Sequence, residues 1–410
     1  MENNKYITHK LGFFFVLLIL ILCSCTHLST INEAERTEQI EFRPREELPA
    51  RPEADYITIV AAGDNLYHDV MIRAGEQGNY ESFYSEIRPL IEAADIAFIN
   101  QETLLAGADF GFSGYPQFNS PQKAGQAVAA AGFNIVNHAT NHVMDKGEKA
   151  VLATKDFWDT VPGVTVLGIH RSREERDVPK LVKKNNITLG FLSYTYGTNG
   201  LPVPSGKPYL VSLINTEIMA EEIDTLRPLC DILIVSMHWG EEYQHNYSKN
   251  QERLAAFLAE HCVDLVIGHH PHVLQPVEYI RRPDGGDMLC FYSLGNLISA
   301  QTRTPALLGA LAYIKIKKTP AHSGETAGIV FMEAGAIPLV THYERNFTGF
   351  KVYPLYAYTG ELAEKHRKNQ EQKELTMDYL AGLASTVLGD KEMPRNPFVD
   401  SPVFASGADL

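Results

Sequence analysis

The chain has 410 residues, of which 45% are hydrophobic and 21% charged. This composition is typical of a globular protein with a sizeable core and excludes a wholly disordered chain. The net charge is −14, and the sequence contains no cluster of Lys and Arg of the kind that binds nucleic-acid phosphates. We therefore expect no nucleic-acid partner.

The N-terminus has the features of an export signal. Lys5 and Lys10 precede an apolar segment at residues 11–22, which is the length of a signal-peptide core and shorter than the ~20 residues of a membrane span. Leu-Cys-Ser-Cys follows at residues 22–25 and resembles a bacterial lipobox. We predict a lipoprotein signal peptide at residues 1–25 and lipidation of Cys25; the alternative is an uncleaved anchor with two incidental cysteines. Acylation would hold the protein in the cell envelope, on the extracytoplasmic side of a membrane.

The rest of the chain divides by composition. Residues 26–55 are rich in Glu and contain three prolines, so they cannot bury enough apolar surface to fold alone and are predicted to be a flexible tether. Apolar runs with strand and helix periodicity begin at residue 56. We predict one folded domain at residues 56–345 and a C-terminal extension at residues 346–410.

Polar side chains follow each of the first three predicted strands. The residues that follow are Gly63-Asp64 after the strand at 56–62, Asn100-Gln101-Glu102 after the strand at 96–99, and Asn141, His142 and Asp145 after the strand at 134–136. A single polar residue at a strand end is usually a cap. The repetition indicates a site at the carboxyl edge of a sheet, where α/β folds place their ligands.

Two further strands end in histidines. The run at 231–237 leads to His238 and Glu242, and the run at 263–267 leads to Gly268-His269-His270-Pro271-His272. A capping box at Ser248 begins a helix between them. Strand, helix and strand form a right-handed crossover, so the two groups of imidazoles should be neighbours. After a strand at 288–292, the alternation at 307–317, 328–334 and 337–343 predicts an antiparallel sheet.

Imidazoles combined with carboxylate and amide oxygens favour Mn, Zn or Fe over Ca or Mg. The candidate ligands are Asp64, Glu102, Asn141, His238, His270 and His272. Such a site would polarise an ester, phosphoester or amide and lower the pKa of a bound water. His142, with Asp145 as its partner, is the candidate catalytic acid or base. The alternatives are a buried polar network that stabilises strand ends and a site that no longer turns over.

These motifs, with His238-Trp239-Gly240-Glu241-Glu242-Tyr243 and Ser293-Leu294-Gly295-Asn296, resemble the CapA family over residues 57–300. These are the bacterial capsule or poly-γ-glutamate biosynthesis proteins of the calcineurin-like metallophosphatase superfamily. The resemblance implies an α/β (α+β) four-layer sandwich of two β-sheets flanked by helices. It implies His270 and His272 as ligands, Glu242 and Asn296 as supporting residues, and His269 as a bystander.

The sequence departs from the superfamily pattern at two positions. Leu66 stands where the first block, Asp-x-His, has its histidine, and Asn100-Gln101-Glu102 replaces Gly-Asp-x-x-Asp. We therefore expect one divalent ion or a weaker pair. His68 and Asp69 are interpreted as helix-start residues.

Two functions follow from the resemblance. The first is a lipid-anchored, metal-dependent hydrolase or transferase that acts on an anionic envelope polymer or its precursor. The second is a non-catalytic accessory protein for polymer export or assembly in a membrane complex. Basic side chains near the site would favour an anionic substrate, and the candidates are Arg73, Lys123, Lys146 and Arg303. The loop at 199–206 is placed where it could cover the site.

Overall fold

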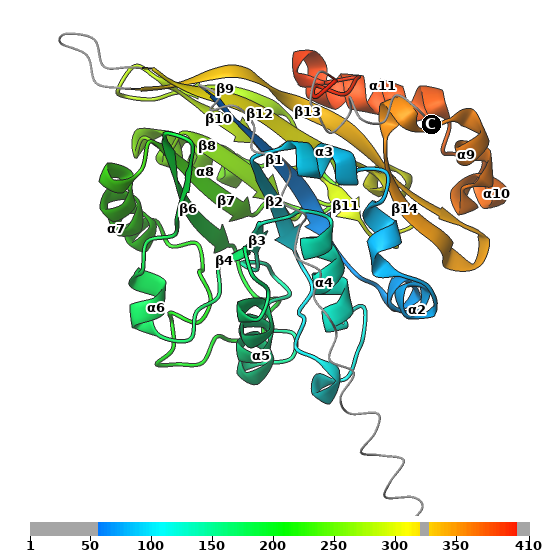
Figure 1. Cartoon of the computed structure of the whole chain (residues 1–410), viewed down its shortest axis with the longest axis horizontal. Coiled ribbons are helices and arrows are strands. Elements are labelled where there is room, and N and C mark those ends of the chain that lie inside the picture. Colours follow the sequence, from blue (N-terminus) through cyan, green and yellow to red (C-terminus); the bar gives the residue numbers. More distant parts are fainter. Residues whose placement is uncertain (1–55, 320–327, 400–410) are drawn as a thin grey trace, which may run out of the picture. The chain divides into compact units, whose positions relative to one another are not determined.

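The computed structural model describes residues 56–319 and 328–399 (Figure 1). The predicted signal peptide, the lipidation site Cys25 and the tether lie outside these residues. Within the described ranges, none of the helices has both the length and the apolar character that a membrane crossing requires.

The described residues form two sheets. The first has eight strands in the order β14-β13-β12-β1-β2-β3-β4, with β11 paired to β1. Its strands are β1 (Tyr56–Asn65), β2 (Ile96–Gln101), β3 (Ile135–Asn137), β4 (Thr165–Leu167), β11 (Asn296–Ile298), β12 (Leu308–Thr319), β13 (Gly328–Glu344) and β14 (Thr348–Pro354). Strands β1 to β4 are parallel, and β12 to β14 extend the sheet in antiparallel fashion.

The second sheet has six strands in the order β5-β6-β7-β8-β10-β9. They are β5 (Leu181–Lys184), β6 (Ile187–Thr195), β7 (Ile232–His238), β8 (Leu265–His269), β9 (Val277–Arg281) and β10 (Asp287–Phe291). The four central strands are parallel, so their carboxyl ends meet at one edge. The two sheets contact each other where Phe98 of β2 stacks on His269 of β8, with ring centroids 5.6 Å apart.

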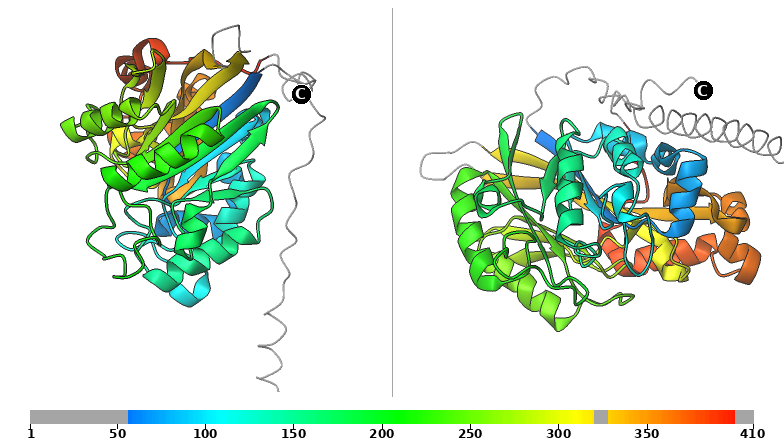
Figure 2. Two further views of the ribbon diagram at one scale, coloured as in Figure 1. Left: turned by 90° about the vertical axis from the view of Figure 1, so that its left-hand side faces the viewer. Right: turned by 90° about the horizontal axis from the view of Figure 1, so that it is seen from below.

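Helices cover the two sheets. They are α2 (Asp69–Gln77), α3 (Arg88–Ala93), α4 (Gln122–Ala130), α5 (Glu148–Asp159), α6 (Arg173–Asp177), α7 (Thr216–Leu226), α8 (Lys249–Glu260), α9 (Gly360–Lys365), α10 (Arg367–Gln372) and α11 (Met377–Leu388). Helices α7 and α8 pack their apolar faces against β7, β8 and β10 of the second sheet. Helices α4 and α5 lie on the side of the two sheets that faces away from α7 and α8 (Figure 2). The predicted fold class is confirmed: two β-sheets flanked by helices.

The strands that deliver the polar side chains are buried, apart from Tyr56 at the start of β1. Strand β1 pairs with β12 and β2 and is covered on both faces, which explains its continuous apolar sequence. Gly63 and Gly268 stand directly before the polar residues at the ends of β1 and β8. A Cβ at Gly63 would lie 2.0 Å from the Gly295 carbonyl oxygen, and one at Gly268 would lie 2.0 Å from that of Tyr292. Only glycine permits these approaches.

The C-terminal part differs from the prediction. The segments expected as two strands at 328–334 and 337–343 form one long strand, β13, because β12 pairs with it across the expected break, from Gly328 to Val340. Strand β14 then pairs with β13, so the compact domain continues past the boundary expected at residue 345. The charged helix expected from residue 359 is divided at His366, whose side chain caps the next helix, α10. His68 precedes α2, as predicted.

Candidate metal centre

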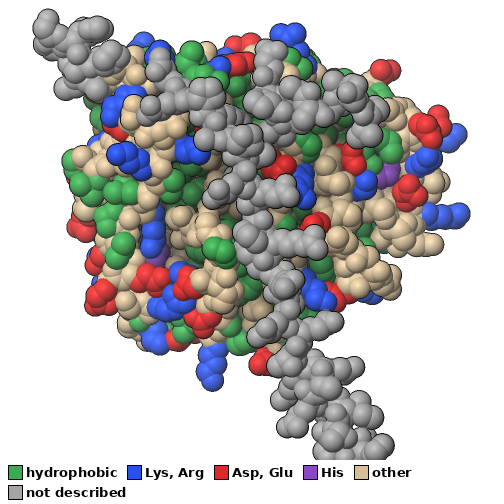
Figure 3. Space-filling model, in the orientation of Figure 1, with side chains coloured by type: hydrophobic (Ala, Val, Ile, Leu, Met, Phe, Trp, Pro, Cys, Tyr) green, Lys and Arg blue, Asp and Glu red, His purple; other side chains and the backbone are tan. Residues whose placement is uncertain are grey.

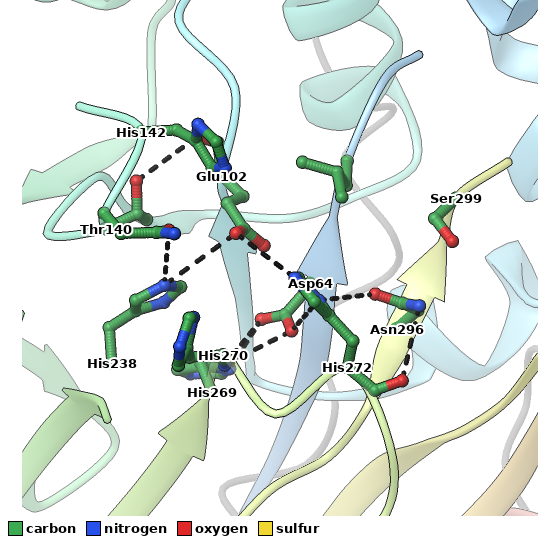
Figure 4. Close-up of polar contacts among 12 residues, drawn as sticks. Asp64, Glu102, Thr140, His142, His238, His269, His270, His272, Asn296 and Ser299 are labelled. Carbon is green, nitrogen blue, oxygen red and sulfur yellow. Dashed lines mark hydrogen bonds and ion pairs between the residues drawn. The ribbon is translucent and has the colours of Figure 1, made fainter. Parts of the chain in front are cut away.

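The polar side chains at the strand ends converge on one site (Figure 4). Asp64 and Glu102 stand at the ends of β1 and β2, and His238 at the end of β7. His270 and His272 come from the segment after β8. The crossover prediction is confirmed, because His238 pairs with His269 in the sheet and the rings of His238 and His270 lie 4.9 Å apart.

Glu102, His270 and His272 form the tightest group. One ligand atom from each lies within 4.8 Å of the others, and all three residues are buried. Both carboxylate oxygens of Glu102 and Nδ1 of His270 lack a hydrogen-bond partner among the described residues. His270 and His272 adopt positive φ values of 96° and 59°, a strained backbone that is common at functional sites. Buried polar atoms without partners are costly, so their clustering indicates a site that can bind a cation.

His272 is held by two neighbours. Its Nδ1 lies 3.0 Å from Asp64 Oδ2 and 3.0 Å from Asn296 Oδ1. Its Nε2 lies 3.8 Å from Glu102 Oε1. Burial alone would lower the pKa of His272, but the charges of Glu102 and Asp64 and the bond to Asp64 raise it to about 9. The carboxylates of Asp64 and Glu102 therefore surround this ring with negative charge, which favours a cation beside it.

The two buried carboxylates differ. Burial favours the neutral form of both, but the hydrogen bond and the charge of His272 lower the pKa of Asp64. The pKa of Glu102 is raised well above its usual value, chiefly by burial, because attraction to His272 is opposed by Asp64 and Glu242. Asp64 is therefore the ionised partner of His272, whereas Glu102 has no hydrogen-bonding partner among the described residues.

His238 is also bound on both sides. Its Nε2 lies 2.9 Å from Asn141 Oδ1, and its Nδ1 lies 3.4 Å from Nδ2 of Asn100. Asn100 in addition donates to Asp64 at 2.8 Å and accepts from Asn137 at 2.7 Å. Asn100 thus connects β1, β2, β3 and β7. The sequence interpretation counted it among the polar residues at strand ends but gave it no specific role in the site.

The predicted acid or base pair is formed. His142 Nδ1 lies 2.7 Å from Asp145 Oδ2, which also accepts from the Phe118 amide at 2.7 Å. Because a carboxylate only accepts, Nδ1 carries the hydrogen and Nε2 can take up or release a proton. The His142 ring packs edge-on against Phe118, which fixes its orientation.

Four side chains that are exposed or partly exposed lie near the candidate ligands. The Tyr196 ring lies 4.6 Å from that of His270 and is half-exposed. Glu242 is exposed, and its neighbour Tyr243 lies 6.1 Å from the His272 ring. The guanidinium of Arg303 lies 4.3 Å from the centre of the Tyr243 ring. The sequence interpretation did not include Tyr196, since a tyrosine directly before a loop glycine is a weak signal.

A further basic candidate and the loop can also be placed. Lys123 pairs with Glu76 on α2 at 3.9 Å, whereas Arg303 contacts Tyr243. In the loop expected to cover the site, Asn199 Oδ1 accepts from Asn141 at 3.2 Å, and its Nδ2 lies 3.4 Å from His142. This loop therefore borders the site.

The residues fit a divalent metal ion. Glu102, His270 and His272 offer an oxygen and two nitrogens, with His238 3.8 Å from Glu102. Asp64 and Asn141 are not members of this group of three. Asp64 contacts the ring of His272, and Asn141 contacts the ring of His238, so in this arrangement they orient the imidazoles. This mixed donor set favours a transition metal.

His269 lies next to this group. It is fully buried, and neither ring nitrogen has a hydrogen-bond partner among the described residues. Burial lowers its pKa to about 4, so the ring is neutral. His269 is placed beside Asp64, at 3.8 Å, and against Phe98.

The fold and site define an α/β protein with a candidate divalent-metal centre between two sheets. More specifically, the chain belongs to the bacterial capsule synthesis protein family PGA_cap, whose model matches residues 58–301. This confirms the expected family. The chain is 25% identical to the PGA biosynthesis protein CapA of Bacillus subtilis (strain 168) over 293 residues, covering 70% of this chain and 74% of that protein.

The capsule biosynthesis protein CapA of Bacillus anthracis is 27% identical over 228 residues. That match covers 54% of this chain and about half (53%) of the B. anthracis protein. Among solved structures, the Haemophilus influenzae NAD nucleotidase is similar with a TM-score of 0.42 and 10% identity, covering 86% of this chain and 66% of that one. A putative 5′-nucleotidase from Staphylococcus aureus gives a TM-score of 0.36 and 12% identity, covering 73% and 54%.

Proposed function

We propose that this member of the capsule synthesis family is a lipid-anchored, extracytoplasmic, metal-dependent hydrolase or transferase. Its substrate would be an anionic envelope polymer such as poly-γ-glutamate, or a precursor of one. The observation that carries the proposal is the buried group of Glu102, His270 and His272, with both oxygens of Glu102 unpartnered among the described residues, beside the His142–Asp145 pair.

Glu102, His270 and His272 would hold the ion, with His238 next to them. A divalent ion bound there would supply a Lewis acid that polarises an ester, phosphoester or amide and lowers the pKa of a bound water. Asp64 and Asn296 keep Nδ1 of His272 engaged, so that its Nε2 faces Glu102. This second layer of contacts fixes the ligand geometry.

His142 would move the proton. Asp145 accepts from Nδ1, which leaves Nε2 to exchange a proton with substrate or water. Figure 4 places His142 above Glu102 on the side of His238. Asn199, from the bordering loop, limits the space around the His142 ring.

Arg303 would favour an anionic substrate. It lies over Tyr243, whose ring is near that of His272, and is exposed. A cation at the edge of a buried site attracts anions and orients them on entry. The half-exposed ring of Tyr196 supplies an apolar wall on the His270 side.

A metal analysis combined with an activity screen tests this proposal. Purified protein should contain a stoichiometric transition metal and hydrolyse members of a panel of phosphoesters and γ-glutamyl amides. His270→Ala should lose both metal and turnover, whereas His261→Ala, at the end of α8, should lose neither. Metal-free protein without histidine-dependent turnover would contradict the enzymatic proposal.

One observation favours a second function, that of a non-catalytic accessory protein for polymer export or assembly. Leu66, which is 2% exposed, stands where the superfamily pattern has a ligand histidine. This site therefore offers one imidazole fewer than the pattern does. An accessory protein would bind polymer without turning it over. Binding of poly-γ-glutamate with equal affinity by the wild type and His142→Ala, and no turnover by either, would favour this second function.

A further inference from the structure

A cavity lies between α6, β6 and α7, and the candidate metal ligands do not line it. It has a volume of about 290 Å³, near the lower end of the roughly 300–1,000 Å³ range of ligand pockets. Its apolar wall includes Leu167, Phe191, Ile218 and Leu226. The charged residues Arg173 and Asp177 of α6 stand at its rim and are exposed.

Three residues that line this cavity each have a buried polar atom without a hydrogen-bond partner among the described residues. These atoms are Nδ1 of His170, Nη2 of Arg176 and Oγ of Ser193. The side chain of Arg176 is 5% exposed, and His170 and Ser193 are 6% and 5% exposed. Native proteins leave few such atoms unpaired, so three on the lining residues of one cavity point to a bound ligand.

The other atoms of these side chains are fixed. Arg176 Nε donates to Glu222 Oε1 at 2.8 Å, and Nη1 donates to the Pro208 carbonyl at 3.0 Å. Tyr194 donates to the second oxygen of Glu222 at 2.6 Å. Nη2 is therefore a positioned donor that needs an acceptor. His170 Nε2 lies 3.2 Å from Ser212 Oγ, and donation to that hydroxyl leaves Nδ1 as an acceptor.

The charges of the lining balance. Three basic residues, Arg173, Arg176 and Lys180, face three acidic residues, Asp177, Glu221 and Glu222. Acidic and basic side chains are also interspersed on the surface at the lower left of Figure 3, where α6 lies. Because like charges repel, a balanced lining disfavours a ligand with a large net charge and suits one that carries both signs.

We propose that this cavity binds a free α-amino acid with an apolar side chain. The carboxylate would accept from Arg176 Nη2 and from the Ser193 hydroxyl. The ammonium group would donate to His170 Nδ1, near the carboxylate of Glu222. The side chain would lie against Phe191 and Ile218. This site is separate from the metal centre, and the proposal does not depend on the function proposed above.

Thermal denaturation and calorimetry of the purified full-length chain test the proposal, with L-leucine and L-methionine as probes. Either amino acid should raise the Tm in a saturable manner, because a ligand that binds the folded state stabilises it. Two leucine analogues define the chemistry: 4-methylpentanoate lacks the ammonium group, and 3-methylbutylamine lacks the carboxylate. Each should bind at least roughly tenfold more weakly than leucine, which corresponds to one lost charged hydrogen bond.

Variants locate the site. Ser193→Ala removes a hydroxyl that has no partner among the described residues, so it should leave folding intact and weaken leucine binding roughly tenfold. Arg176→Lys keeps a cation beside Glu222 but removes the planar guanidinium and its Nη2 donor. It should weaken leucine binding at least as much as Ser193→Ala does. The matched control Arg171→Lys alters an exposed arginine outside the cavity and should have no effect. His142→Ala should also leave leucine binding unchanged.

Three results would overturn the proposal. The first is the absence of a saturable Tm shift with either amino acid at concentrations up to about 10 mM, which would detect a Kd of about 1 mM. The second is equal binding of leucine and 4-methylpentanoate, which would make this a simple carboxylate site. The third is binding that is lost in His142→Ala but retained in Ser193→Ala, which would place the amino acid at the metal centre.

Discussion

Nδ1 of His272 lies 3.0 Å from Asp64 Oδ2, and this contact joins the end of β1 to the segment that follows β8. A carboxylate bound to one nitrogen of an imidazole fixes the ring and leaves the other nitrogen for a cation. The two sheets therefore share a ligand: the first sheet orients an imidazole that the second sheet supplies.

This contact predicts the effect of Asp64→Asn. The variant should fold and should bind Mn²⁺ or Zn²⁺ roughly 10–100-fold more weakly, as expected when a partner of a ligand histidine is removed. Calorimetric titration of metal-stripped protein measures the change. Asp109→Asn, at an exposed position, is the matched control and should bind as the wild type does. Unchanged affinity in Asp64→Asn would show that Asp64 does not orient His272 for a metal.

Glu102→Gln should separate stability from metal binding. The carboxylate of Glu102 has no hydrogen-bond partner among the described residues, so its replacement by an amide of the same shape removes no hydrogen bond that the structure describes. We expect the free energy of unfolding of metal-free protein to change by less than about 1 kcal/mol. Metal affinity should fall at least roughly tenfold, because an anionic ligand is lost. Urea denaturation in EDTA measures the first quantity, and calorimetry the second. A large loss of stability without metal would indicate a purely structural role.

Much of the fold follows from the sequence because its signals are local. Strands β1, β2, β7 and β8 are short apolar runs with polar ends, and the helix between β7 and β8 begins at a capping box that the structure contains. The error at β13 has the opposite cause. Gly335 looks like a break between two strands, but the backbone of Lys391 passes close to it, and only the tertiary structure shows this.

The site was predictable as a set of strand-end residues, but not as a network. The structure brings Asp64, Glu102, Asn141, His238, His270 and His272 together, and it adds Asn100, which bonds to neighbours on three other strands or their ends. Sequence cannot distinguish a side chain that faces a cation from one that orients a ligand. That difference depends on which atom of Asp64 or Asn141 meets which ring nitrogen, and therefore on the register between strands.

Gly268→Ala should be strongly destabilising. The added Cβ would lie 2.0 Å from the Tyr292 carbonyl oxygen, and backbone cannot move aside as a flexible side chain can. We expect a loss of about 3 kcal/mol or more, in the range of severe overpacking. Gly382→Ala in α11 is the control: it meets no atom within 4 Å and should stabilise the helix by up to about 1 kcal/mol. Denaturant titration of both variants measures the difference, and equal stabilities would contradict the close packing of β8 against the segment after β10.

Cys25→Ser tests the proposed anchor. Acylation of Cys25 would supply the chains that hold the protein on a membrane, and serine offers no thiol to acylate. The wild type should be found in the membrane fraction of cells and in the detergent phase, and Cys25→Ser should lose metabolic labelling by a fatty acid. Cys23→Ser, two residues earlier, is the matched control and should remain labelled. Labelling of Cys25→Ser would contradict the lipobox assignment.

His138 should contribute to acid sensitivity. Its buried ring accepts from Trp158 Nε1 at 2.7 Å, and burial lowers its pKa from 6.5 to about 3. Below about pH 6.5 the unfolded chain takes up a proton here and the folded chain does not, so stability falls as the pH decreases towards 3. For one such group the slope is about 1.4 kcal/mol per pH unit. His138→Gln keeps an acceptor for Trp158 but does not titrate. Urea denaturation between pH 6 and 4 should therefore show a shallower fall of the unfolding free energy with decreasing pH in the variant than in the wild type. The two slopes should differ by the equivalent of about one bound proton. Equal slopes would contradict a neutral buried His138.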